Sequence, residues 1–175
     1  MRNRSFSLAI AWSCVAAVPA SADAIGDWNQ KAVAFVEARQ MPPPNGERVM
    51  ALVHLAMFDA VNSIERRYRP GVTQLTASAT ASKEAAAAAA AGTVLAGLDP
   101  KGAAEIKGAI AAYLVGIPAG EPKAEGIRLG ESVAANLLQA RADDGAGAAD
   151  AIVGPRPRPG STFRPRAPWA RHGPR

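Results

Sequence analysis

Residues 47–64, ERVMALVHLAMFDAVNSI, decide the fold class of this chain. Apolar residues recur in them at the spacing of one helical face, and this main stripe consists of Val49, Leu52, Val53, Ala56, Ala60 and Ile64. A second set extends the apolar surface around the cylinder, and it consists of Met50, Leu55, Phe58 and Val61. A helix that is apolar on most sides needs neighbours on most sides. These residues therefore predict a central core helix.

The flanking sequence predicts further helices and no strands. Residues 24–41 form an amphipathic pattern whose apolar face is Ile25, Trp28, Ala32, Phe35 and Val36. The three prolines that follow, at positions 42–44, predict a loop through residue 46, because proline lacks an amide hydrogen and restricts the residue before it. Residues 71–82 read as an irregular crossing.

Three more helices are expected beyond that crossing. Ser82 can cap a helix through the alanine run of residues 85–98, whose flatness suggests a tight contact between helices. Asp99 and Pro100 predict the start of a fourth helix, which should stop at Gly116. A fifth should run over residues 122–142. The buried stripe of the fourth helix is expected to be Ile106, Ile110, Tyr113 and Leu114.

The composition supports a single all-α helical bundle. The chain has 175 residues, enough for one ordinary domain, and its aromatic content of 5% leaves a core of small aliphatic side chains. One cysteine and two histidines leave too few ligands for a disulfide framework or an ordinary zinc site. We therefore expect no metal and no cofactor in this chain.

The first 22 residues have the pattern of a secretory signal peptide. Arg2 and Arg4 precede an apolar run over residues 6–18, and a small-residue cleavage site ends at Ala22. The run is too short for a stable membrane span. We expect cleavage after Ala22 and a periplasmic or secreted product whose helical domain covers residues 23–146.

Residues 147–175 are expected to be a disordered tail rich in arginine and proline. Residues 154–175 contain six arginines and no acidic residue, whereas residues 23–153 contain twelve basic and fifteen acidic residues. The high pI therefore comes from the tail. Such a tail could bind phosphates, but nucleic acid is not an expected partner of an exported chain.

Four polar residues of the core helix region are candidates for structural roles. His54 is expected to be a core histidine whose ring nitrogens are hydrogen-bonded. Asp59, Asn62 and Arg66 fall in one sector of the helix, and Asp59 should anchor Arg66, another arginine or nearby helix-start amides. The common phosphate-loop, zinc-protease and serine-hydrolase motifs are absent from the sequence, so no residue is assigned a catalytic role.

Residues 42–70, PPPNGERVMALVHLAMFDAVNSIERRYRP, resemble the N-terminal helical region of exported bacterial vanadium-dependent haloperoxidase-like proteins. Their superfamily also contains type-2 phosphatidic acid phosphatases and bacterial acid phosphatases. The similarity covers residues 23–146, and residues 53–62 are its most specific part. It implies the incomplete N-terminal half of a larger helical fold.

The superfamily's oxyanion site uses Lys with Arg-Pro seven residues later, then Pro-Ser-Gly-His, then Ser-Arg followed by His. This sequence has none of these blocks, because Arg69-Pro70 has Asn62 where the lysine would stand. The resemblance therefore implies an inactive scaffold, with vanadate bound only in a complete peroxidase-type relative. Whether such a relative is a peroxidase or a phosphatase is left open.

The resemblance also implies a truncated chain whose tail composition fits a reading-frame change or an early stop. The missing C-terminal half, or self-association through the apolar faces of the second and fifth helices, would then supply the partner. The alternative is an autonomous periplasmic helical binding or interaction protein whose basic tail contacts an acidic partner.

Overall fold

The computed structural model describes residues 23–146, and its regular structure is entirely helical there. The signal peptide and the arginine- and proline-rich tail predicted above lie outside these residues. The chain divides into two compact units after residue 142, and all the helices described belong to the first unit. The prediction of an all-α helical bundle is confirmed.

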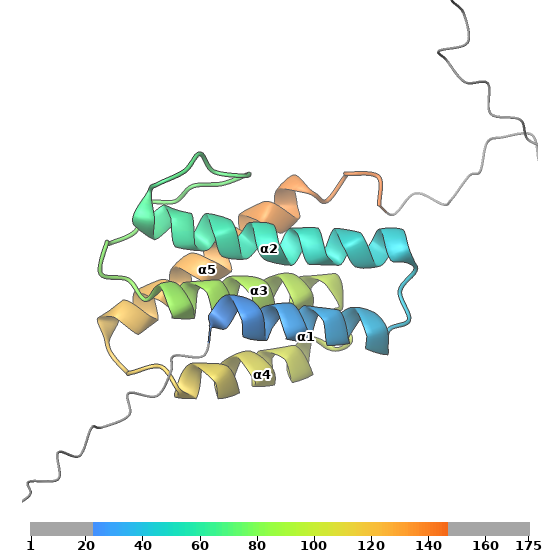
Figure 1. Ribbon diagram of the computed structural model, residues 1–175, viewed down its shortest axis with the longest axis horizontal. Helices are drawn as coiled ribbons and strands as arrows, with labels where there is room; N and C mark the ends of the chain where they lie inside the picture. Colours follow the sequence, from blue (N-terminus) through green and yellow to red (C-terminus); the bar gives the residue numbers. More distant parts are fainter. Residues whose placement is uncertain (1–22, 147–175) are drawn as a thin grey trace, which may run out of the picture. The chain divides into compact units, whose positions relative to one another are not determined.

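The helices are α1 (Ala24–Ala38), α2 (Pro43–Glu65), α3 (Lys83–Leu98), α4 (Ala103–Val115) and α5 (Glu121–Ala140). Helix α3 packs against each of the other four, and Figure 1 shows it in the middle of the bundle, between α2 and α4. The core helix predicted at residues 47–64 is therefore a neighbour of the central helix, which is the alanine-rich α3. The reason is size, because a helix of alanines lets several others approach its axis closely.

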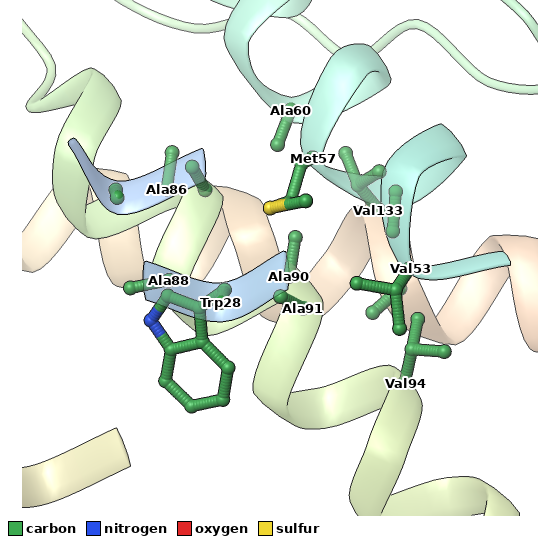
Figure 2. Close-up of a cluster of buried hydrophobic side chains, with 14 of the residues drawn as sticks. Trp28, Val53, Met57, Ala60, Ala86, Ala88, Ala90, Ala91, Val94 and Val133 are labelled. Atoms are coloured by element: carbon green, nitrogen blue, oxygen red, sulfur yellow. The ribbon is translucent and has the colours of Figure 1, made fainter. Parts of the chain in front are cut away.

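The core is built around the buried alanines of α3. Every residue of the run Ala85–Ala91 is at most 1% exposed, and the larger buried side chains come from the helices around it. Figure 2 shows Trp28 of α1, Met57 of α2 and Val133 of α5 gathered about this run. Close packing of this kind leaves little room for larger side chains on α3.

Two glycines of α5 set the closest approach to α3. A Cβ atom built on Gly130 would lie 2.3 Å from the carbonyl oxygen of Ala86, and one built on Gly126 would lie 2.4 Å from that of Ser82. The absence of both side chains lets the two helices meet backbone to backbone. The main stripe of α5, including Leu129, Val133 and Leu137, is buried. The expectation that this apolar face of the fifth helix lacks a partner is therefore wrong.

Helix ends agree with the sequence at some positions and differ at others. The Ser82 hydroxyl accepts the Ala85 N–H at 3.1 Å, as predicted for a cap. Helix α2 begins at Pro43, inside the stretch expected to be a loop, because proline is tolerated in a first turn whose amides have no helical partner. Helix α4 ends at Val115, before Gly116, as expected.

The start of α4 is a second correction. Asp99 ends α3 instead of opening the next helix, which begins at Ala103 after a short turn. The Asp99 carboxylate is paired with Arg39 at the end of α1, with Arg39 Nε donating at 2.9 Å. A contact between two helix ends takes the residue that local sequence assigned to a cap. In the expected stripe of α4, Ile106 and Leu114 are buried, whereas Ile110 and Tyr113 are half-buried.

Candidate functional site

Asp59, on the C-terminal half of α2, has a buried carboxylate that is 1% exposed. Its Oδ1 accepts the N–H of Gly71 at 2.7 Å, and its Oδ2 accepts those of Val72 and Thr73, both at 2.9 Å. Asp59 therefore anchors backbone amides, which was one of the expected kinds of partner. The amides belong to the irregular crossing after α2 and not to a helix start.

Two neighbours of Asp59 hold the same crossing. The Asn62 side chain donates to the carbonyl oxygen of Tyr68 at 2.8 Å and accepts the Tyr68 N–H at 2.9 Å. Ser63 Oγ accepts the Leu75 N–H at 3.1 Å and donates to the carbonyl oxygen of Asp59 at 2.8 Å. We call Asp59, Asn62 and Ser63 the loop anchor. They are the buried polar residues of the described chain, and all three bind backbone.

Arg66 takes part in this region through its backbone. It ends α2 in the left-handed conformation, with φ of 55° and ψ of 37°, and its N–H donates to the carbonyl oxygen of Asn62 at 2.7 Å. Its side chain is exposed. The predicted sector therefore brings Asp59 and Asn62 to one loop, whereas Arg66 turns the chain away from the helix axis. Sequence reasoning missed Ser63, although it lies one turn beyond Asp59.

His54 has a different environment from the one expected. It is exposed, and its Nε2 lies 2.9 Å from Oδ1 of Asn29 on α1. The expectation of a core histidine is wrong, because position 54 lies on the side of α2 that neither α3 nor α5 covers. Its hydrogen bond joins the two helices at their surface.

An apolar groove lies between α2, the start of α1 and the beginning of the crossing. Its volume is about 430 Å³, and its lining residues are Ile25, His54, Met57, Phe58, Val61, Asn62, Glu65 and Tyr68. Phe58 and Tyr68 are 40% and 65% exposed, and their ring centroids are 6.2 Å apart. The groove is thus open to solvent and has an aromatic wall.

One end of this groove carries basic side chains. Glu65 is paired with Lys83 Nζ at 2.5 Å and with Arg67 Nε at 3.4 Å. The hydrogen bond from Lys83, with a smaller contribution from the positive charge of Arg67, holds the pKa of Glu65 below its ordinary value. Exposed Arg66 and Arg69 flank the same segment. We call Arg66, Arg67 and Arg69 the basic rim.

A second polar arrangement lies on the opposite side of α1. The Trp28 Nε1 is buried and is the one side-chain polar atom so buried in the described part of the chain that has no hydrogen-bond partner. The Trp28 ring packs edge-on against Tyr113 at 6.1 Å, and the Tyr113 hydroxyl donates to Glu84 at 3.2 Å. Burial, followed by the negative charge of Glu84, raises the pKa of Tyr113 to about 12.

No protein-family model, curated protein or solved structure matches this chain. Over residues 23–146, no helix is both long and apolar enough to cross a bilayer. The same residues contain no cluster of three histidine, cysteine or acidic side chains that could bind a metal ion. The groove and the loop anchor are therefore the features from which a function has to be argued.

Proposed function

We propose that this chain is the N-terminal helical scaffold of an exported vanadium-dependent haloperoxidase or acid phosphatase-like protein and is inactive by itself. The resemblance of residues 42–70 supports this proposal. The observation that carries the scaffold role is the loop anchor, because it lies in and beside the most specific part of that resemblance. All three of its side chains are engaged by backbone groups and have no free geometry for chemistry.

The oxyanion-binding blocks of the superfamily are absent from the printed sequence. In a complete relative, as the resemblance implies, lysine and arginine would neutralise vanadate or phosphate, and histidine would serve as ligand or nucleophile. The missing half would supply those groups and pack on apolar side chains that the bundle exposes. Val115 on α4, which is 81% exposed, offers one such contact.

Reading the coding DNA beyond codon 140 in all three frames tests this proposal directly. We expect the Lys with Arg-Pro, Pro-Ser-Gly-His and Ser-Arg with His blocks to appear in a shifted frame or after the stop. The purified chain should show neither vanadate-dependent bromination nor phosphate-ester hydrolysis. Either activity in the isolated chain, or the absence of the blocks from every frame, would contradict the proposal.

The proposed location is outside the cytoplasm. Cleavage after Ala22 would leave Asp23, whose carboxylate caps α1 by accepting the Ile25 N–H at 3.1 Å, as the first residue. The N-terminal sequence of the product isolated from its host checks this. A cytoplasmic product that starts at Met1 would contradict export.

The second candidate is an autonomous periplasmic binding or interaction protein. The observation that favours it is the open apolar groove beside the basic rim, because exposed apolar patches on small proteins are often binding sites. In this view residues 154–175, with their six arginines, contact an acidic partner. Salt-sensitive capture of an acidic partner that needs these residues would favour this candidate over the scaffold.

A further inference from the structure

The groove on α2 gathers apolar side chains that a folded chain normally covers. Five large hydrophobic residues of the described chain are exposed, and three of them, Ile25, Phe58 and Tyr68, line this groove. Met57 and Val61 complete its apolar floor and wall. Apolar surface that gathers in one concave place favours a ligand more than isolated exposed residues do.

The wall formed by Tyr68 is held in position from within the fold. Both backbone polar groups of Tyr68 are bound by the buried Asn62 side chain, at 2.9 and 2.8 Å. Asp59 fixes the backbone three to five residues further along. The basic rim, which surrounds Tyr68 in the sequence, is thus attached to an anchored segment. A ligand would meet a groove that is already shaped, which lowers the ordering cost of binding.

The charge at this end of the groove is positive. Residues 65–69 contain one acid and three arginines, and the acid, Glu65, is already paired with Lys83 and Arg67. Arg67 contacts a residue of the groove lining, so its guanidinium lies at the edge of the groove. An arginine at such an edge is suited to bind a carboxylate.

The same charge disfavours the other occupants that this chain could supply. Residues 154–175 carry six arginines and residues 1–22 carry two, and neither segment contains an acid. A second copy docked groove to groove would place two basic rims in one interface. Like charges brought together in this way oppose association. The complementary occupant is therefore an anion from outside the chain.

We propose that this groove binds a single-chain amphiphile with a carboxylate head, such as a fatty acid. Its alkyl chain lies along Phe58, Met57 and Val61, and its carboxylate meets Arg67 and Arg69. A volume of about 430 Å³ lies in the range typical of small-molecule sites. Along α2 the lining extends from His54 to Glu65, a helical rise of about 16 Å. The groove can hold this ligand whether or not the chain is a haloperoxidase scaffold.

Calorimetric titration of the full chain with dodecanoate, below its micellar concentration, tests the proposal. We expect one saturable site, with dodecyltrimethylammonium, which has the same chain and the opposite charge, binding at least ten-fold more weakly. Phe58→Ala and the double variant Arg67→Glu/Arg69→Glu should each weaken dodecanoate binding at least ten-fold. Ile25→Ala, on the other side of the groove, is a second variant in case Phe58→Ala fails to fold.

Matched controls separate the groove from other surfaces. Val33→Ala changes an equally exposed apolar residue of α1 outside the groove and should leave the affinity within two-fold of the parent chain. Arg164→Glu/Arg166→Glu makes the same charge change in the tail and should also have no more than a two-fold effect.

Three outcomes overturn the proposal. Equal affinity for the cationic and anionic amphiphiles would remove the role of the basic rim. Loss of binding in the tail variant, with Phe58→Ala binding normally, would place the anion on residues 154–175. A dimer in sedimentation that Phe58→Ala dissociates would make a second copy of the chain the occupant of the groove.

Discussion

At the scale of single residues, Asp59 shows what local sequence can and cannot predict. Its place on an otherwise apolar helix predicts a buried carboxylate with structural partners, because an unpaired charge in a core is costly. The partners themselves could not be predicted. Gly71, Val72 and Thr73 lie 12 to 14 residues further along, in a segment without periodicity. Only the left-handed turn at Arg66 brings that segment back along α2.

Asp59→Asn should destabilise the chain by about 3 kcal/mol, because an amide replaces a carboxylate that accepts three backbone N–H groups in a buried place. Urea unfolding of the variant and the parent measures this difference. Glu131→Gln, the same type of change at an exposed position on α5, should stay within about 0.5 kcal/mol. A loss below 1 kcal/mol for Asp59→Asn would show that these hydrogen bonds contribute little to stability.

Asp99 should make stability depend on pH in acid. The hydrogen bond from Arg39, aided by the backbone N–H groups of the following turn, holds the pKa of Asp99 below its ordinary value of 3.8. The unfolded chain therefore binds a proton more readily, so this stabilising contribution is present above pH 3.8 and is lost as the pH falls through the folded-state value. Unfolding free energies measured from about pH 5 to pH 2 should fall less steeply in Asp99→Asn. Parallel slopes in the two proteins would argue against this contribution.

At the scale of helices, the pairing of α3 with α5 depends on two glycines one turn apart. The sequence indicates this pairing, because Gly126 and Gly130 permit close approach and the alanine run offers a flat partner. It does not predict where helices begin when a terminal residue serves a distant contact. Asp99 satisfies the local rules for a cap, yet its carboxylate binds Arg39 of α1.

Gly130→Ala should destabilise the bundle by about 1 to 2 kcal/mol, because the clash with α3 exceeds the gain in helix propensity. The new Cβ would lie 2.3 Å from the Ala86 carbonyl oxygen and 2.8 Å from the Ala90 nitrogen, both of them backbone atoms. Thermal unfolding followed by circular dichroism measures the effect.

Gly108→Ala is the matched control for that substitution. Gly108 lies inside α4, and no atom would lie within 4 Å of its new Cβ. The control should therefore stabilise the chain by up to about 1 kcal/mol. Equal effects of the two substitutions would show that the helix crossing is looser than described.

At the scale of the whole bundle, α3 is the element that every other helix needs. The apolar pattern of residues 47–64 indicated α2 as the centre, since long side chains dominate any estimate from hydrophobicity. The observed centre is instead the helix with the smallest side chains (Figure 1). Side-chain size decides how many neighbours a helix can hold, and a sequence pattern on one helix does not report that number.

Native-state hydrogen exchange should follow this arrangement. Helix α4 has α3 as its one close backbone neighbour among the described helices, whereas α3 has four. Amides in the middle of α4 should therefore exchange at least ten-fold faster than those of residues 86–94, because local opening of α4 exposes less buried surface. Mass spectrometry of peptides from both helices measures this. Equal protection would indicate that α4 opens only together with the whole bundle.

The alanine run at the centre also affects how this protein should be mapped by mutagenesis. Alanine scanning replaces side chains with a methyl group and finds the positions that matter by what is lost. Residues 85–91 already are alanine and are fully enclosed, so such a scan passes over the segment on which the whole bundle packs. A scan by serine or leucine would find it at once, because there the critical property is the absence of anything larger than a methyl group.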